Sequence, residues 1–120
     1  VYKRQLLSLS CGQNQLSELD VSQNLELETL SFTSNYISSI DVTQNSNLKQ
    51  LYSTDNPLFE LNITQNPLLN YLSCGQNQLI ELDVTQNQEL VFLSCVNNQL
   101  SGINLENNTN LITLNFQNNV

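Results

Sequence analysis

The stretch "CGQNQLSELDVSQN" at residues 11–24 returns almost unchanged as "CGQNQLIELDVTQN" at residues 74–87. The two copies lie three periods apart, because leucines recur every 21 residues on both sides of each copy. A fixed self-similarity of 20–50 residues is typical of an architecture in which similar units stack one upon another. The period therefore predicts a solenoid and takes precedence over any local assignment of secondary structure.

Three columns of this unit hold the same residue in all six copies, without insertion or deletion from residue 6 to residue 120. We divide the chain into five full repeats at 6–26, 27–47, 48–68, 69–89 and 90–110, and a partial sixth at 111–120. The constant residues are Leu6, Leu27, Leu48, Leu69, Leu90 and Leu111 at position 1, Leu9, Leu30, Leu51, Leu72, Leu93 and Leu114 at position 4, and Asn14, Asn35, Asn56, Asn77, Asn98 and Asn119 at position 9.

The repeat reads L-x-x-L-x-C-x-x-N-x-L-x-x-L-D-V-T-Q-N-x-x. Apolar residues at positions 1, 4 and 6 place side chains on one face of a short strand, and stacked units lay these strands in parallel, about 4.8 Å apart. Positions 14 and 16 are apolar around an outward residue, which predicts a short extended or 3-10 segment on the opposite side. A 21-residue unit leaves room for little or no α-helix.

The first eleven positions of the unit, L-x-x-L-x-C-x-x-N-x-L, resemble a known family. They are similar to bacterial leucine-rich repeats with 21-residue units, especially internalin-like cell-surface proteins with a cysteine at the sixth position. The resemblance covers residues 6–120 and implies a mostly-β leucine-rich-repeat solenoid, wound as a right-handed superhelix with a parallel sheet on its concave face. It also implies a binding module for a protein ligand and an extracellular or cell-surface location.

The composition argues against several other functions. Eleven acidic and three basic residues give a net charge of −8, which makes nucleic acid and anionic membranes poor partners. The apolar runs are far too short for membrane insertion. The chain has no His, no nucleophile with a matched base and no phosphate-binding loop, so the sequence predicts neither an enzyme nor a cofactor.

Two asparagine columns are interpreted as structural. The position-9 column lies where the chain leaves the strand, and a side-chain amide there can satisfy backbone groups of the turn in its own and neighbouring repeats. A second column is expected to do the same at the opposite bend. Its members are Asn24, Asn45, Asn66, Asn87 and Asn108.

The cysteines occupy the inward position 6. Phe32, Ser53 and Phe116 take the same position in other repeats, which marks it as a packing site where free cysteine behaves as a small hydrophobe. We interpret Cys11, Cys74 and Cys95 as buried, reduced thiols. A bond between Cys74 and Cys95 is the alternative, because neighbouring strands lie within disulfide reach. No metal site is expected, since no His or second cysteine accompanies any of them.

An outward column at position 15 is mostly acidic and raises the alternative of a calcium-binding carboxylate ladder. Two asparagines interrupt it, and the glycine-rich calcium repeat is missing, so we favour a capping or solvated role. A neighbouring hydroxyl column suggests ice binding but ends at Glu106. The two columns are Asp20, Asp41, Asn62, Asp83 and Asn104, and Ser22, Thr43, Thr64 and Thr85.

Specificity in a solenoid is carried by variable outward positions, because the constant positions build the fold. Most residues at positions 3 and 5 are small and polar, with aromatic exceptions on three successive repeats. We interpret these aromatics and their neighbours as a candidate ligand-binding patch; the alternative is that the rings merely pack on one another. A carbohydrate-binding surface and a structural stalk remain open as other functions. The candidate patch comprises Lys49, Gln50, Tyr52, Tyr71, Val91 and Phe92.

The two ends of the chain suggest a fragment of a larger protein, because neither shows a recognisable capping unit. The repeat register is continuous from Leu6 onward and absent in residues 1–5, "VYKRQ". These five residues match a translation of GTG-TAT-AAG-AGA-CAG, the end of a common sequencing adapter. Our hypothesis is that they are a non-native scar, which would leave Lys49 as the only basic residue of the native repeat. The alternative is a short native lead-in from a capping element.

Overall fold

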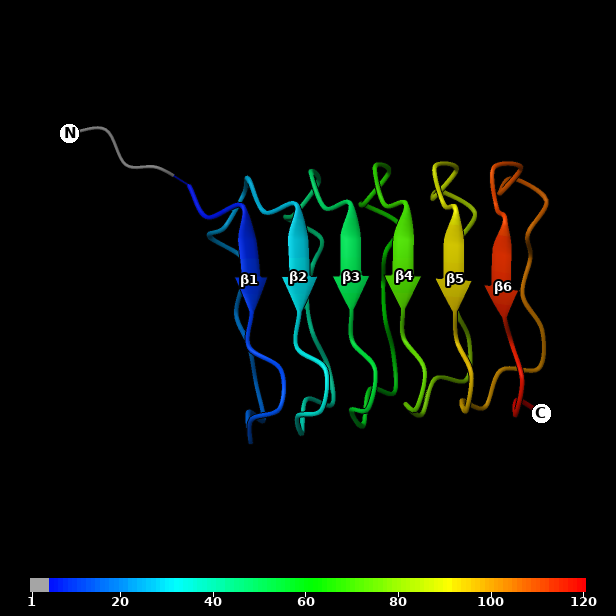
Figure 1. Cartoon of the computed structure of the whole chain (residues 1–120), viewed down its shortest axis with the longest axis horizontal. Coiled ribbons are helices and arrows are strands. Elements are labelled where there is room, and N and C mark those ends of the chain that lie inside the picture. Colours follow the sequence, from blue (N-terminus) through cyan, green and yellow to red (C-terminus); the bar gives the residue numbers. More distant parts are fainter. Residues whose placement is uncertain (1–4) are drawn as a thin grey trace.

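A computed structural model describes residues 5–120. Residues 1–4, which make up most of the hypothesised scar, lie outside the described part. The described chain forms one six-stranded sheet in which every strand pairs in parallel with its neighbours in sequence. Figure 1 shows the strands side by side in sequence order, with each connection passing behind the sheet. The strands are β1 (Ser8–Ser10), β2 (Thr29–Ser31), β3 (Gln50–Tyr52), β4 (Tyr71–Ser73), β5 (Phe92–Ser94) and β6 (Thr113–Asn115).

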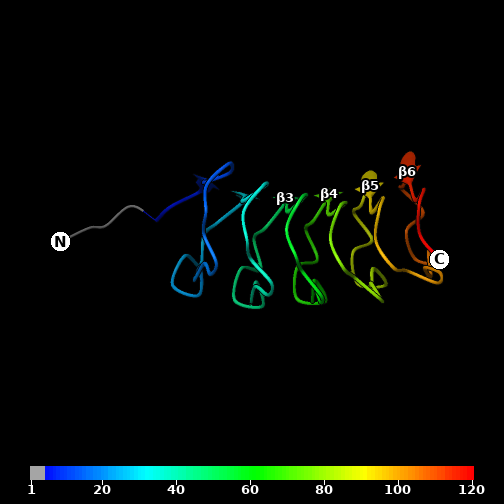
Figure 2. The ribbon, with the colours of Figure 1, turned by 90° about the horizontal axis from the view of Figure 1, so that it is seen from below.

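The sheet register follows the 21-residue period. Leu30 of β2 pairs with Leu9 of β1 and Leu51 of β3, and the same pairing of position-4 leucines continues to β6. Figure 2 shows the coils of the solenoid from below, with the strands along one side and the return segments along the other. Residues 5–120 contain strands and turns but no helix, so the fold expected from the repeat is confirmed.

The core is a column of apolar side chains enclosed by each turn of the solenoid. Positions 1, 4, 6, 11 and 16 point inward, and in the middle repeats their side chains are completely buried. Parallel strands connected through the back of the sheet bury the side that faces the connection, and here that side carries leucine in every repeat. The largest fully buried side chains include Phe32, Leu30, Ile37, Leu48, Leu51, Leu72 and Leu90.

The back of each repeat is an extended segment followed by two tight turns. In the second repeat the Asn45 N–H donates to the Val42 carbonyl, and the Leu48 N–H donates to the Asn45 carbonyl, each spanning four residues. Corresponding bonds recur in the other full repeats. The fold therefore returns to the sheet through turns and extended chain, which is what a 21-residue unit has room for.

The asparagines at position 9 connect each repeat to the one before it. The Asn56 Nδ2 donates to the Ser53 carbonyl of its own turn at 3.2 Å and to the Phe32 carbonyl of the preceding repeat at 3.1 Å. Its Oδ1 accepts the Ile37 N–H at 3.1 Å. One buried amide thus satisfies backbone groups that the turn leaves without partners.

The asparagines at position 19 bridge the opposite bend. Asn66 Nδ2 donates to the carbonyls of Val42 and Asn45 in the preceding repeat, at 3.0 and 2.8 Å. The side chain is fully buried, and its Oδ1 accepts no hydrogen bond from the described residues. The amides of Asn45, Asn87 and Asn108 have the same arrangement.

The residue before each position-9 asparagine adopts the left-handed backbone conformation. Its φ lies between 53° and 61° in all six repeats, yet none of these residues is glycine. L-amino acids pay for this conformation, and asparagine and aspartate tolerate it better than most. The six residues are Gln13, Ser34, Asp55, Gln76, Asn97 and Asn118.

Candidate binding surface

Three aromatic rings form a ladder across the sheet face that points away from the core. The Tyr71 and Phe92 rings are stacked, with centroids 4.2 Å apart and planes inclined by 5°. The Tyr52 and Tyr71 rings are tilted, with centroids 5.0 Å apart and planes inclined by 34°. Tyr71 therefore has a neighbouring ring on each side along the solenoid axis. We call Tyr52, Tyr71 and Phe92 the aromatic ladder.

The backbone register explains why these rings meet. Tyr71 and Phe92 are direct register partners on β4 and β5, and side chains of directly paired residues on one face are close enough for rings to touch. Tyr52 pairs with Ser73 rather than with Tyr71, and reaches Tyr71 along the diagonal. The small serine partner leaves the space that the tilted Tyr52 ring uses.

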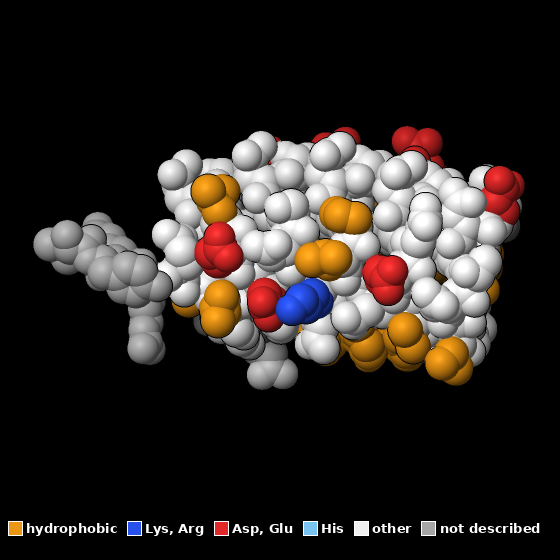
Figure 3. All heavy atoms as spheres, turned by 90° about the horizontal axis from the view of Figure 1, so that it is seen from above, with side chains coloured by type: hydrophobic (Ala, Val, Ile, Leu, Met, Phe, Trp, Pro, Cys, Tyr) orange, Lys and Arg blue, Asp and Glu red, His pale blue; other side chains and the backbone are white. Residues whose placement is uncertain are grey.

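The residues around the ladder supply polar groups and one further apolar side chain. The Tyr52 hydroxyl donates to Gln50 Oε1 at 3.4 Å, and the hydroxyls of Thr54 and Ser73 are 2.8 Å apart. Val91 directly precedes β5 and is 41% exposed. Hydrophobic side chains gather towards the strand side of the molecule, over its C-terminal half, in the view of Figure 3.

Lys49 is held by a carboxylate. Its Nζ lies 3.2 Å from Glu28 Oε1 on the neighbouring repeat, and both side chains are a little under half exposed. An exposed ion pair contributes little to stability. It does hold the side chain of Lys49, the only lysine of residues 5–120, on the side of the sheet where the strands begin. The structure thus brings Tyr52, Tyr71 and Phe92 into contact, whereas Lys49 is paired with a residue that was not a candidate.

The three thiols are free but not equally buried. Cys74 and Cys95 are completely buried, while Cys11, in the first repeat, is half-buried because the described chain covers it on one side only. Burial raises the pKa of the Cys95 thiol to about 11 and raises the pKa of Cys74 further. Thiols protonated at neutral pH act as packing groups rather than as nucleophiles.

The acidic column at position 15 organises the back turns. Asp41 Oδ1 accepts the Thr43 N–H at 2.9 Å and the Thr43 hydroxyl at 2.6 Å, and these hydrogen bonds lower the pKa of the Asp41 carboxyl. Asp83 and Asn62 make the same local bonds to the threonine two residues later. Within residues 5–120, no group of three or more His, Cys, Asp or Glu side chains is arranged to hold a metal ion.

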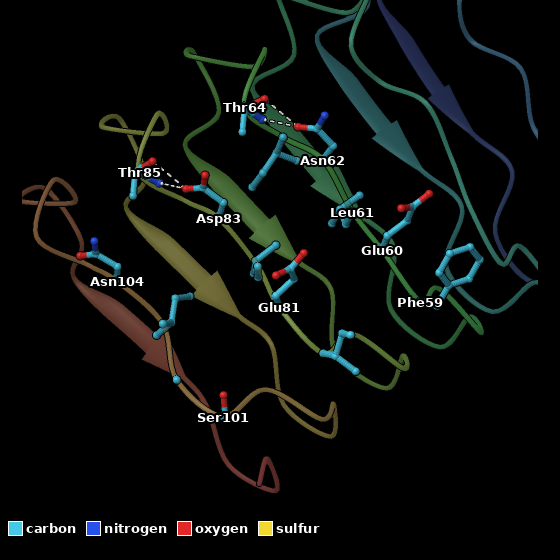
Figure 4. Close-up of a pocket in the computed structure, with 15 residues that line it drawn as sticks. Phe59, Glu60, Leu61, Asn62, Thr64, Glu81, Asp83, Thr85, Ser101 and Asn104 are labelled. Atoms are coloured by element: carbon cyan, nitrogen blue, oxygen red, sulfur yellow. Dashed lines mark hydrogen bonds between the residues drawn. The ribbon is translucent and has the colours of Figure 1, made fainter.

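A hollow that was not predicted from the sequence lies on the back of the third to fifth repeats. It has a volume of about 820 Å³, and Figure 4 shows Phe59 and Glu60 towards one end, Ser101 and Asn104 at the other, and Glu81 and Asp83 between them. Phe59 and Ile80 share position 12, where the other three full repeats carry serine. Their side chains are 53% and 64% exposed. The sequence did contain a signal for this hollow, namely large apolar residues at the same outward position of two adjacent repeats.

The fold is similar to solved structures of repeat proteins. An internalin, InlF, from Listeria monocytogenes aligns with a TM-score of 0.92 and 28% identity over 95% of this chain. The Leptospira interrogans LRR protein LIC12759 gives 0.87 and 31% over 96%. The functional domain of InlJ from Listeria monocytogenes, which includes a cysteine ladder, gives 0.70 and 27% over 95%.

These similarities concern part of each relative. The chain spans about a third of the length of the three solved chains: 35% of InlF, 32% of LIC12759 and 35% of InlJ. No protein-family model matches the chain, and no curated protein matches it. The described residues also include no helix of the length and apolar character needed to cross a membrane.

Proposed function

Because this chain is a leucine-rich-repeat solenoid with 21-residue units and internalin-like architecture, we propose that it is a non-catalytic binding module. The ligand is a protein, bound on the outer face of the sheet through the aromatic ladder. The parent protein is a secreted or cell-surface bacterial protein, as the likeness to internalins suggests. The observation that carries the proposal is the contact between three half-buried rings on successive strands of an otherwise small and polar face.

The ladder has the character of an interface centre. Aromatic residues, above all tyrosine and tryptophan, are enriched among the few residues that carry most of the binding energy at protein interfaces. Rings that already pack on each other lose little conformational freedom when a partner covers them, which favours affinity. The hydroxyls and amides of Gln50, Thr54 and Ser73 form the polar surroundings that such a centre needs.

The ring geometry favours a protein over a sugar. A sugar packs against the free face of an aromatic ring, but both faces of Tyr71 lie beside neighbouring rings. Tyr71 therefore presents its ring edge and its hydroxyl, rather than a ring face, to a ligand. Edges suit interlocking with side chains of a protein partner, where edge-to-face aromatic contacts are favourable.

The experiment that tests the proposal selects ligands on the intact chain. We expect a phage-displayed random peptide library to yield peptides whose binding is lost in a variant with Tyr52→Ala, Tyr71→Ala and Phe92→Ala. The matched control carries Leu25→Ala, Tyr36→Ala and Leu68→Ala, which removes three exposed large side chains elsewhere. Peptides that bind the ladder variant as tightly as the wild type would contradict the assigned face.

A glycan array distinguishes the carbohydrate alternative. We expect no glycan whose binding depends on Tyr52, Tyr71 and Phe92. If a glycan binds the wild type and the matched control but not the ladder variant, the ligand of this face is a carbohydrate and not a protein. If the ladder variant loses neither peptides nor glycans, the stalk alternative is favoured.

A further inference from the structure

The back hollow combines an apolar floor with an acidic rim. Leu61 and Leu82 form part of the floor, and the exposed side chains of Phe59 and Ile80 stand beside it. An apolar surface that remains exposed next to a depression is characteristic of an interaction site rather than of a plain solvated face. The volume of about 820 Å³ is within the range of clefts that bind ligands.

The charges around the hollow are all negative. The carboxylates of Glu60, Glu81 and Asp83 line it, each on an exposed residue, and its lining includes no lysine or arginine. Hydrogen bonds from Thr85 lower the pKa of the Asp83 carboxyl, so that this group is ionised at neutral pH. Residues 5–120 carry eleven acidic residues and one basic residue, a net charge of −10, so the wider field also attracts cations.

The return segments at the hollow leave backbone groups free. In the part of the chain that the structure describes, the N–H groups of Leu61, Asn62, Leu82 and Asp83 donate to no backbone carbonyl. The chain here is extended, and exposed extended chain offers a row of donors and acceptors to another extended segment. The repeat following these two has Gly102 at the rim, where an added Cβ would meet nothing within 4 Å.

We propose that this hollow binds an extended segment of a basic protein, with apolar side chains against Phe59 and Ile80 and lysine or arginine side chains against Glu60, Glu81 and Asp83. The site is independent of the aromatic ladder, because the ladder occupies the sheet face and the hollow lies on the return segments. The apolar part sets the position of the segment, whereas the carboxylates select its charge and accelerate its association.

The test uses the whole chain and a defined probe. The probe is a fluorescein-labelled peptide of alternating lysine and leucine, followed by fluorescence anisotropy at low ionic strength. We expect saturable binding, and no binding of the matching peptide of alternating glutamate and leucine. Raising the salt concentration weakens the complex, because the ion pairs are exposed and are screened.

Two pairs of variants separate the hollow from a general charge effect. We expect Glu60→Gln with Glu81→Gln to weaken the lysine–leucine peptide about three- to tenfold. The control, Glu89→Gln with Glu106→Gln, removes the same charge from exposed residues outside the hollow and should change affinity less than about twofold. Equal losses in the two pairs would overturn the proposal, since binding would then follow net charge alone.

The apolar contribution has its own control. We expect Phe59→Ser with Ile80→Ser to weaken the peptide about tenfold or more while leaving the thermal unfolding midpoint nearly unchanged, because both side chains are more than half exposed. If that variant binds like the wild type and spermine competes as strongly as the peptide, the hollow selects small polycations and the proposal is wrong. Absence of saturable binding by the wild type would also refute it.

Discussion

The rings of Tyr71 and Phe92 lie face to face with their centroids 4.2 Å apart, on directly paired residues of β4 and β5. The contact follows from the repeat itself, because a 21-residue period without insertions brings position 3 of one unit beside position 3 of the next. The residue types at one outward position of two neighbouring repeats therefore determine which side chains touch on the surface. The constant positions of the repeat form the scaffold that holds these variable side chains.

The stacked pair should stabilise the fold as well as shape the surface. We expect Tyr71→Ala and Phe92→Ala to be less than additive in the free energy of unfolding, with a coupling of about 0.5–1.5 kcal/mol. Urea unfolding of the two single variants and the double variant measures the coupling. A coupling indistinguishable from zero would mean that the rings do not pack on one another in solution.

The position-9 asparagine should be important for stability. Asn56→Ala removes an amide that serves two repeats. It leaves the buried Ile37 N–H without a partner, whereas the Phe32 carbonyl keeps only the hydrogen bond from Asn35 Nδ2. We expect a loss of about 1–3 kcal/mol in the free energy of unfolding, the cost of unmet buried groups. The control is Gln44→Ala, at an exposed residue. Unchanged melting of the Asn56 variant would count against its role at the turn.

The left-handed residue offers a test of backbone strain. Gln76 has a φ of 53° and an exposed side chain, so its replacement changes the backbone preference and few contacts. We expect Gln76→Val to cost about 1–2 kcal/mol, because a β-branched residue fits this conformation poorly, and Gln76→Asn to be neutral or stabilising. Gln78→Val is the control, at an exposed residue without positive φ. Equal effects of the two valines would rule out the backbone explanation.

The thiols should differ in reactivity with position. At pH 8 we expect Ellman's reagent to modify Cys11 first, and Cys74 and Cys95 only when the chain unfolds, because burial keeps these two thiols protonated and inaccessible. Three thiols reacting together in the folded chain would refute the buried column. Fewer than three after denaturation, without reductant, would reveal a disulfide.

The raised thiol pKa values also predict a pH dependence of stability. The folded state holds the Cys95 proton up to a pKa of about 11, whereas the thiol of an unfolded chain loses its proton around the ordinary pKa of 9.0. The contribution to stability is therefore complete below pH 9 and is lost as the pH rises from 9 towards 11. Chemical unfolding across this interval should show a smaller decline for Cys95→Ala than for the wild type. An equal decline in both would point to other groups.

The fold was predictable because its information is repeated. Leucine at positions 1 and 4 recurs six times in strict register, so the period alone indicates a stacked parallel sheet, whatever any single unit favours locally. The short return path was predictable for the same reason, since 21 residues cannot hold a strand, two bends and a helix of useful length. The six-stranded parallel sheet and the absence of helix in residues 5–120 confirm both expectations.

The surface was predictable only in outline. The sequence indicates which aromatic residues point outward, but the stacking of Tyr71 on Phe92 and the tilt of Tyr52 depend on side-chain torsions that a pattern does not contain. The left-handed position carries Gln, Ser, Asp or Asn and never glycine, so the usual sign of that conformation is missing. The back hollow depends on the separation of neighbouring return segments, which follows from the packing of whole units.

Residue-level mapping of a bound ligand shows whether the sheet face of this chain is its binding surface. Backbone amide chemical shifts of the labelled chain are recorded with and without a peptide selected from the displayed library. The binding-module account predicts the largest changes at residues 50–52, 71–73 and 92–94. Changes concentrated at residues 59–62 and 80–83 instead, or spread evenly over the chain, would contradict the assignment of the ladder as the ligand-binding face.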